Sequence, residues 1–348
     1  MLSVSDVRLS GRNVQLGDTL YLGWSGSFVE FETDSHSISM DLCTDKTPLE
    51  EIYLARVAVY VEDLQEPVRI LTLRTPCVHV CIPVSDGSQM KAVRILRLTE
   101  AAFGLSGIRH LDVEDGARVR PTQPKARRIE FIGDSITCGY GIESRSPATF
   151  STATENPVSA YAMLTAKALD ADCSLVAWSG IGLISSWVDA STEEPNQALL
   201  MSKLFPYHHL RLSERLNTPA DLHVFAEDPA DLVVINIGTN DSSWTRGKPE
   251  REALFGEAYL HFLEQVHAVR PSSPILSILG TMGQSLCDTV EEQVRLFQSA
   301  HPEAWVRFLR MPMQRAEDGL GADGHPTPAT QRIAADHLIA GIQELRPW

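Results

Sequence analysis

The chain has 348 residues and a formal charge of −15, from 30 Lys and Arg against 45 Asp and Glu. Its 43% hydrophobic and 22% charged residues are typical of a globular protein, and its acidic balance disfavours nucleic acid as a partner. No apolar run approaches the roughly 20 residues of a membrane-spanning helix. The six cysteines are scattered, as reduced thiols are. Membrane-spanning, fibrous, disordered and disulfide-scaffold classes are therefore excluded, and the length favours two domains.

The first part of the chain, residues 1–122, contains short apolar segments separated by turns and no helical periodicity. In one of them Val57, Val59 and Val61 alternate with other residues, as in a strand with one buried face. Strands are predicted at residues 21–24, 28–31, 37–42, 55–60, 68–73, 78–83 and 92–98. Short strands at this spacing favour an all-β sandwich.

The pattern changes near residues 118–128, where two prolines and a basic cluster without periodicity predict a linker. From 124 to 348, strands predicted at 129–132, 174–178, 232–237, 275–279 and 306–309 alternate with helices predicted at 159–169, 249–269, 289–300 and 328–345. The nearly continuous apolar run at 232–237 is typical of a parallel strand that is covered on both faces. Residues 124–348 therefore predict an α/β domain with a doubly wound, five-stranded parallel sheet.

Polar residues and glycines follow the predicted strands. Ser135 comes after the first strand, Gly180 after the second and Asn240 after the third, and Asp323 and His325 lie after the fifth. Ligands of such sheets bind beyond the carboxyl ends of the strands. A helix cap, turn glycines and an Asx turn would each explain one of these residues. Together at one edge, a nucleophile, oxyanion donors, a base and an acid are the parts of an acyl-transfer site.

The segments around these residues read FIGDSITCGYG, WSG, GTND and DGHP. In this order they resemble the four sequence blocks of the SGNH (GDSL-type) hydrolases. WSGS at 24–27 and RLTEAAFG at 97–104 also resemble the sandwich of carbohydrate esterase family 2, to which nearly the whole chain is similar. The resemblance implies a flavodoxin-like SGNH hydrolase domain preceded by a jelly-roll sandwich, and removal of acetyl groups from plant polysaccharides.

The resemblance also implies a role for each residue. Ser135 would be the nucleophile and His325 the base, and the oxyanion would be bound by the backbone N–H groups of Ser135 and Gly180 and the side-chain amide of Asn240. Asp323 lies two residues before the histidine, where many of these enzymes place the acid three before. Either the Asp323 carboxylate, as third catalytic residue, or a main-chain carbonyl would then orient the ring.

Other residues are predicted to support or extend this site. Asp134 and Asp241, next to the serine and the asparagine, are interpreted as braces of their loops. Trp244 and Trp187 lie close in sequence to the predicted catalytic edge and are predicted to bind substrate by stacking on sugar rings. The long segment 187–229 predicts part of the rim or a lid. No phosphate-binding loop or metal-ligand spacing is present, so no cofactor or metal is expected.

The sequence thus predicts a serine esterase that deacetylates xylo- or manno-oligosaccharides through an acetyl-serine intermediate. One alternative is a lysophospholipase or acyl thioesterase on the same scaffold, and another is a carbohydrate-binding protein with an inert hydrolase domain. The first residues lack the basic and apolar regions of a secretory signal. We therefore expect a cytoplasmic protein that acts on imported oligosaccharides.

Overall fold

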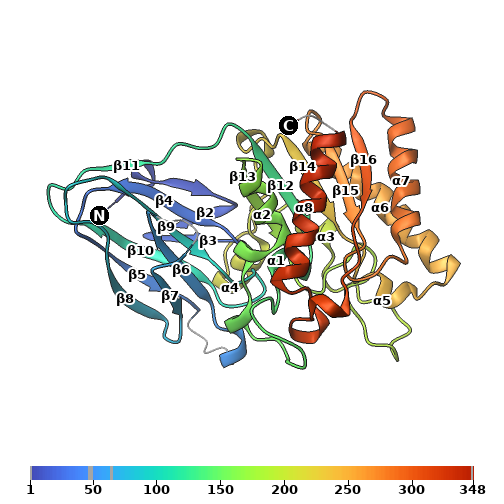
Figure 1. Ribbon diagram of the computed structural model, residues 1–348, viewed down its shortest axis with the longest axis horizontal. Coiled ribbons are helices and arrows are strands. Elements are labelled where there is room, and N and C mark those ends of the chain that lie inside the picture. The colour runs from blue at the N-terminus through green and yellow to red at the C-terminus, as the bar shows by residue number, and fades with distance from the viewer. Residues whose placement is uncertain (1, 46–49, 63–65, 346–347) are drawn as a thin grey trace.

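Strands before residue 122 pair into two antiparallel sheets of the computed structural model, which describes residues 2–45, 50–62, 66–345 and 348. The strands are β1 Arg8–Ser10, β2 Asn13–Leu16, β3 Thr19–Leu22, β4 Phe28–Thr33, β5 Ser37–Cys43, β6 Arg56–Val61, β7 Arg69–Thr72, β8 Cys77–Pro83, β9 Lys91–Arg97, β10 Ser106–Val113 and β11 Val119–Pro121. One sheet has the order β1-β4-β9-β6-β7, with β11 also paired to β4, and the other has the order β2-β3-β10-β5-β8. These sheets form the predicted sandwich (Figure 1).

Alternating burial explains why these segments are strands. In β5, Ile38, Met40 and Leu42 are fully buried, whereas the residues between them are half-buried. The sequence did not predict β1, β2, β10 or β11. In β10 a register shift between Arg109 and Asp112 interrupts the alternation. The predicted linker is partly wrong, because β11 lies within it and pairs with β4.

The second part of the chain forms a parallel sheet with helices on both faces (Figure 1). Its strands are β12 Arg128–Gly133, β13 Asp172–Ala177, β14 Leu232–Asn236, β15 Ile275–Leu279 and β16 Val306–Arg310, and its helices are α1 Ser135–Cys138, α2 Tyr161–Ala168, α3 Met201–Leu204, α4 Leu210–Leu216, α5 Ser242–Thr245, α6 Pro249–Val269, α7 Cys287–Ala300 and α8 Pro328–Leu345. The sheet order β13-β12-β14-β15-β16 is that of flavodoxin-like folds. The predicted doubly wound sheet is confirmed.

Strand β14 shows why its sequence is apolar throughout. Val233 and Ile235 pack in a cluster with α6 and α7, while Val234 packs in another cluster with α2 and α8. Both faces of the strand are therefore covered by helices, as expected for a central parallel strand. None of the helices among the described residues is long and apolar enough to cross a membrane.

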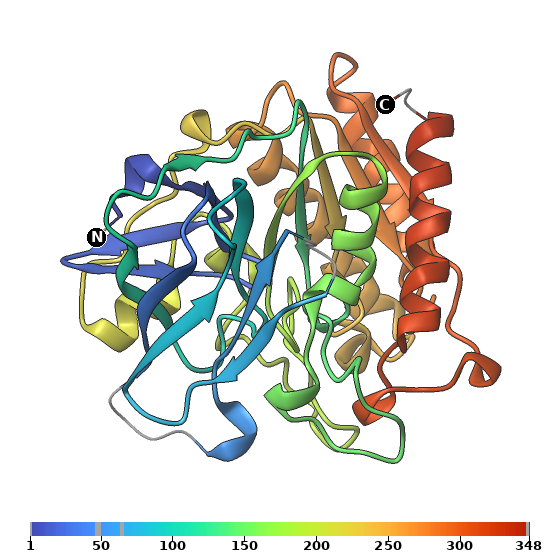
Figure 2. The ribbon, with the colours of Figure 1, turned by 60° about the vertical axis from the view of Figure 1, so that its left-hand side comes forward.

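The segment 187–229 packs partly on the sandwich. Arg12 donates from Nη1 to the carbonyls of Phe205, at 2.6 Å, and Tyr207, at 2.7 Å, and Trp24 Nε1 donates to the carbonyl of His208 at 3.2 Å. Figure 2 shows α4, in yellow, next to the blue strands of the sandwich. These contacts hold this part of the segment against the sandwich, which argues against a lid there, and the alternative of a rim stays a prediction.

A buried ion network also joins the domains. Glu130 of β12 is fully buried and accepts hydrogen bonds from Arg12 of the sandwich and Arg270, each at 3.1 Å. Burial lowers the pKa of Arg12 to about 10, which leaves the guanidinium charged at neutral pH. Because both cations compensate the carboxylate, the network fixes the sandwich against the strand that leads to Ser135.

Candidate active site

Ser135 is placed by the sharp turn between β12 and α1. Asp134 caps the helix by accepting the Ile136 N–H at Oδ1, 3.0 Å away, and Ser135 is the first helical residue. A Cβ on Gly133 would lie 2.0 Å from Thr137 Oγ1, so only glycine fits before this turn. The serine is 5% exposed, and its Oγ lies 2.9 Å from His325 Nε2.

His325 has the tautomer that a general base requires. Its Nδ1 lies 3.1 Å from the carbonyl oxygen of Ala322. A carbonyl can only accept, so Nδ1 carries the proton and Nε2 has a free lone pair facing the hydroxyl of Ser135. Burial lowers the pKa of His325, which keeps the ring neutral near pH 7.

Asp323 faces away from this hydrogen bond. Its Oδ2 accepts from Tyr140 Oη and from the Phe150 N–H, both at 3.0 Å. The backbone at Asp323 is left-handed, with φ 49°. Of the two alternatives for orienting His325, the structure has the main-chain carbonyl at Nδ1, and the Asp323 carboxylate instead ties the histidine loop to the loop that contains Tyr140 and Phe150.

A stack of aromatic rings runs from the histidine into the sandwich. Tyr140 lies 4.3 Å from His325 and 3.8 Å from Phe150, measured between ring centroids. Phe150 stacks on Phe103 at 5.3 Å, and Phe103 stacks on Tyr53 at 5.2 Å. Phe103 and Tyr53 precede residue 122, so the sandwich supports one side of the site. The sequence alone does not reveal this stack, because its members are far apart in the chain.

Asn240 connects the segments that contain the three predicted oxyanion donors. Its Nδ2 donates to the Ile181 carbonyl at 2.9 Å and to Asp134 Oδ2 at 3.3 Å. These bonds join the loop after β14 to the loop that contains Gly180 and to the residue before Ser135. Gly180 has φ 77°, a backbone conformation that favours glycine.

Asp241 holds the loop after β13. It is fully buried and accepts the backbone N–H groups of Leu183, Ile184 and Ser185. Burial raises the pKa of Asp241 to about 6, although these three bonds favour its charged form. A Cβ on Gly182 would lie 2.6 Å from Asp241 Oδ2. Asp241 therefore braces the loop, the supporting role predicted for it.

The two tryptophans that were predicted to bind substrate, Trp187 and Trp244, differ in their exposure to solvent. Trp187 is 59% exposed, and the backbone N–H of this residue donates to the Gly180 carbonyl at 2.7 Å. Trp244 is only 7% exposed, its Nε1 donates to the Glu193 carbonyl at 2.8 Å, and the Arg251 guanidinium lies 4.6 Å from its ring centroid. This burial argues against the predicted stacking role of Trp244, whereas the role of Trp187 stays a prediction.

Glu100 of the sandwich contacts the loop after β13 that contains Gly180, which is called the oxyanion loop below. Its Oε2 accepts the N–H of Ser179, the residue before Gly180, at 2.6 Å. Glu100 lies in the segment 97–104 whose sequence resembled the family's sandwich, which was the only indication of its importance.

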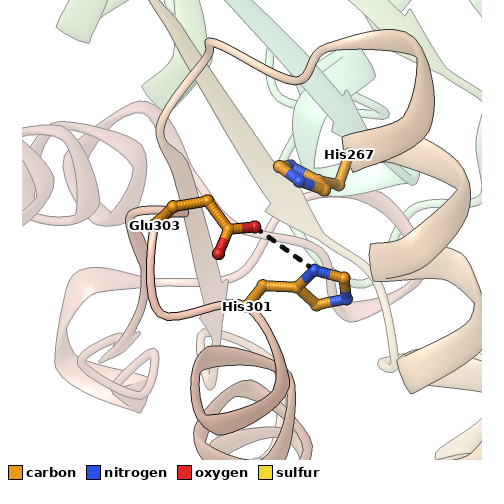
Figure 3. Close-up of side chains that lie close together, drawn as sticks. All are labelled: His267, His301 and Glu303. Atoms are coloured by element: carbon orange, nitrogen blue, oxygen red, sulfur yellow. Dashed lines mark ion pairs between the residues drawn. The ribbon is translucent and has the colours of Figure 1, made fainter.

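Side chains with metal-ligand chemistry gather at the other edge of the sheet. His267 lies in the last turn of α6, His301 follows α7, and Glu303 precedes β16 (Figure 3). Because Ser135 lies at the carboxyl ends of the parallel strands, this group is remote from the serine.

The chain is similar to known proteins. Residues 131–333 match the GDSL-like lipase/acylhydrolase family. The chain is 32% identical over 258 residues to cellulase/esterase CelE of Acetivibrio thermocellus, covering 72% of this chain and 29% of the relative. It is 30% identical over 264 residues to an acetylxylan esterase / glucomannan deacetylase of Cellvibrio japonicus, covering 72% of this chain and 69% of the relative. The match thus spans less than a third of the length of CelE.

Structural similarity extends over both domains. A family two carbohydrate esterase from Clostridium thermocellum, solved in complex with cellohexaose, has a TM-score of 0.83 and 27% identity, covering 97% of this chain and 98% of that one. The sandwich and the α/β domain therefore occur together in that esterase. The chain belongs to the GDSL-like lipase/acylhydrolase family and is similar over its whole length to carbohydrate esterases of family two.

Proposed function

We propose that the protein is a serine esterase that removes O-acetyl groups from xylo- or manno-oligosaccharides of the plant type. The observation that carries this proposal is the 2.9 Å contact between Ser135 Oγ and His325 Nε2, at the edge where the loops of Gly180 and Asn240 meet. The names of the relatives, an acetylxylan esterase / glucomannan deacetylase and a cellulase/esterase, support the choice of an acetylated glycan.

Acylation begins when Ser135 Oγ attacks the acetyl carbonyl carbon and passes its proton to His325 Nε2. The Ala322 carbonyl, which accepts from Nδ1, stabilises the imidazolium that forms. The carbonyl oxygen becomes an oxyanion and takes donors from the backbone of Ser135 and Gly180 and from Asn240. The longer Asn240 bond, 3.3 Å to Asp134, is the one that the oxyanion replaces.

Acylation is completed when the first oxyanion collapses. His325 gives its proton to the sugar oxygen as the ester C–O bond breaks, which leaves an acetyl group on Ser135. Deacylation then repeats these proton transfers with water in place of the serine. Water then loses a proton to Nε2 and attacks the acetyl carbon. Collapse of the second oxyanion releases acetate, and the proton returns to Ser135 Oγ.

An exposed aromatic ring supports a sugar substrate. Trp187 presents its indole to solvent directly beside Gly180. A pyranose bound near the oxyanion loop would find a flat apolar face there. The side chain is a binding residue in this proposal and takes no part in proton transfer.

The test is acetate release from acetylated xylo- and manno-oligosaccharides, with the deacetylated position assigned by NMR. Ser135→Ala is expected to lower kcat by roughly 10⁴-fold or more. Trp187→Ala is the matched comparison, and it is expected to raise KM for the oligosaccharides but not for p-nitrophenyl acetate. Full activity of Ser135→Ala would overturn the mechanism, and faster hydrolysis of octanoyl than of acetyl esters would overturn the substrate class.

A further inference from the structure

Two buried glutamates meet where the sandwich joins the hydrolase domain. Glu100 follows β9 of the sandwich, and Glu155 lies between β12 and α2, and both are 0% exposed. One carboxylate oxygen of each lies within 4.8 Å of the other and of Cys138 Sγ, and Cys138 is the last residue of α1. The nucleophile Ser135 is the first residue of that helix.

Two of the four carboxylate oxygens of the pair have no hydrogen-bond partner among the described residues. Glu100 Oε2 accepts the Ser179 N–H at 2.6 Å, and Glu155 Oε1 accepts the Glu100 N–H at 3.3 Å. Glu100 Oε1 and Glu155 Oε2 are buried and have no hydrogen-bond partner among the described residues. Two adjacent, buried carboxylates with oxygens that lack a partner cannot both be charged at low cost, and one proton on the pair removes the repulsion between them.

The nearby cations are engaged elsewhere. Arg97 is fully buried and donates to the carbonyls of Leu22, Thr99, Glu100 and Gly104. Arg56 donates to the carbonyls of Thr152 and Glu155. Both guanidinium groups attract the pair electrostatically. Other titratable neighbours include the buried Cys138 thiol and the Tyr140 hydroxyl, and burial raises the pKa of both. A net charge near −1 on the pair, rather than −2, fits these surroundings.

We propose that Glu100 and Glu155 share one proton and together position the oxyanion loop, because Glu100 holds the N–H of the residue before Gly180. Both are positioning residues, since neither touches the reacting atoms. This inference rests on the proposed esterase function. Loss of the shared proton leaves two like charges at the domain boundary and displaces the Ser179 contact, so kcat falls at alkaline pH.

The direction of the pH effect follows from burial. Burial raises the pKa of Glu100 to about 7 and raises that of Glu155 as well, with repulsion from Glu100 as a further cause. A carboxyl group whose pKa is raised on folding stabilises the protein most below its unfolded value, about 4.3. That contribution is lost as the pH rises through the folded pKa.

The experiment measures kcat against pH for the full chain and for Glu155→Gln. Glutamine donates to Glu100 permanently, so we expect near-neutral kcat to be retained and the alkaline midpoint to rise by about one pH unit or more. Glu100→Gln provides a second variant with the same expectation. Glu143→Gln is the matched control, because Glu143 contacts Arg56 at 3.6 Å but lies outside the pair.

An unchanged alkaline midpoint in both variants would overturn the shared proton. So would a stoichiometric metal found by elemental analysis and lost in both variants. If the wild-type protein hydrolyses no ester, the esterase proposal fails. The pair is then still tested by thermal unfolding, where the fall in Tm between pH 6 and 9 should be smaller in Glu155→Gln than in wild type.

A second, independent observation concerns the group in Figure 3. Ligand atoms of His267, His301 and Glu303 all lie within 4.8 Å of one another. His301 Nε2 bonds to Glu264 Oε1 at 2.9 Å, which leaves Nδ1 facing Glu303 Oε1 at 3.6 Å. A carboxylate on the outer nitrogen is the usual support of a metal-binding histidine.

The rings of the two histidines are held in place. Phe297 stacks on His301 with centroids 4.4 Å apart and meets His267 edge-on at 5.5 Å. His267 Nδ1 is buried and has no hydrogen-bond partner among the described residues. A buried nitrogen without a partner, on a side chain that lies beside two further ligands, is accounted for by a bound ion or water.

We infer that His267, His301 and Glu303 bind a divalent cation of the zinc class. Two imidazoles and one carboxylate suit zinc better than magnesium or calcium, which prefer all-oxygen sites. Glu303 is exposed, so a water completes the coordination. The cation would join the ends of α6 and α7 to the start of β16 and stabilise the fold.

Thermal unfolding of the full chain with ZnCl₂ or MgCl₂ tests this site. Zinc at about a hundred times its Kd should raise Tm by roughly 5 °C or more, and magnesium should not. His267→Gln and Glu303→Gln should each abolish the rise, whereas His261→Gln, an exposed histidine of α6, should keep it. No rise in wild type, or an equal rise in the His267 and Glu303 variants, would overturn the site.

Discussion

The two domains contribute to the site in different ways. Ser135, Gly180, Asn240 and His325 all lie in the α/β domain, at the carboxyl edge of its sheet. The sandwich supplies supporting groups: Glu100 and the rings of Phe103 and Tyr53 contact the loops of the site, and Arg12 binds Glu130 of the strand that leads to Ser135. Chemistry and support are thus divided between the domains, so we expect substitutions in the sandwich to change stability and the pH dependence of kcat more than the maximal rate.

Ion pairs of the sandwich differ in their expected contribution to stability, depending on whether they lie on its outer surface or at the domain boundary. Its outer ion pairs, such as Arg120 with Glu32 and Arg118 with Asp34, have arginines that are two-thirds exposed. Such pairs contribute about 0–1 kcal/mol each. The pair of Arg12 with Glu130 at the domain boundary is fully buried and therefore matters more.

The largest expected effect is on stability. Arg12→Met removes one of two cations from the buried Glu130 carboxylate and two donors from the segment around Phe205. We expect the free energy of unfolding to fall by about 3–5 kcal/mol in chemical denaturation. Arg120→Gln, at an exposed pair, is the control and should change it by less than about 1 kcal/mol. Equal effects of the two variants would contradict the supporting role of the sandwich boundary.

Loss of Asn240, in the α/β domain, is expected to lower the rate of hydrolysis more than the stability of the protein. Asn240→Ala removes a donor from the developing oxyanion, so kcat for acetyl ester hydrolysis should fall by about 10²–10³-fold. Because the transition state is affected more than the bound ester, KM should change little. A change confined to KM would show that Asn240 binds substrate and leaves the oxyanion to other donors.

A small effect is expected at Asp323. Loss of a catalytic acid that orients the histidine typically lowers kcat by about 10⁴-fold. In this protein the Ala322 carbonyl is bound to Nδ1, so Asp323→Asn should lower kcat by less than about tenfold. Asparagine also tolerates the left-handed backbone. A loss near 10⁴-fold in steady-state kinetics would restore Asp323 as the third catalytic residue.

The two limbs of the pH profile report on different parts of the molecule. We expect His325 of the α/β domain to set the acid limb, and the pair of Glu100 and Glu155 at the domain boundary to set the alkaline limb. Burial lowers the pKa of His325 below its ordinary value of 6.5. The base is active when neutral, so kcat/KM should fall toward acid with a midpoint below 6.5. The Glu155→Gln variant should leave this acid limb unchanged and move only the alkaline one. An acid midpoint above 6.5, measured with a neutral ester, would show that another group controls the base.

Much of the α/β domain could be predicted from the sequence. Its five strands are apolar runs flanked by helices of clear period. Three of the four motifs follow β13, β12 and β14, which are adjacent in the parallel sheet, and the fourth lies after the edge strand β16. Strands of the sandwich such as β10 and β11 were missed because a register shift or flanking prolines hide the alternation of period two.

The supports of the site could not be predicted, for physical reasons. Glu100 and Glu155 meet only because two domains pack together, and no local pattern marks a pair that is 55 residues apart. The partner of His325 Nδ1 depends on a left-handed turn at Asp323, which residue spacing does not reveal. Trp244 follows Asn240 closely in sequence, yet α5 turns its ring inward against Arg251.

The central claim is that Ser135 carries an acetyl group during turnover. Wild-type protein should be mixed with an acetylated xylo-oligosaccharide, quenched in acid within one turnover, and digested for tandem mass spectrometry. The account predicts an acetyl group on Ser135 that disappears when the quench is delayed and that is absent from the Ser135→Ala variant. Release of acetate with no acetylated Ser135 peptide at any time would contradict it.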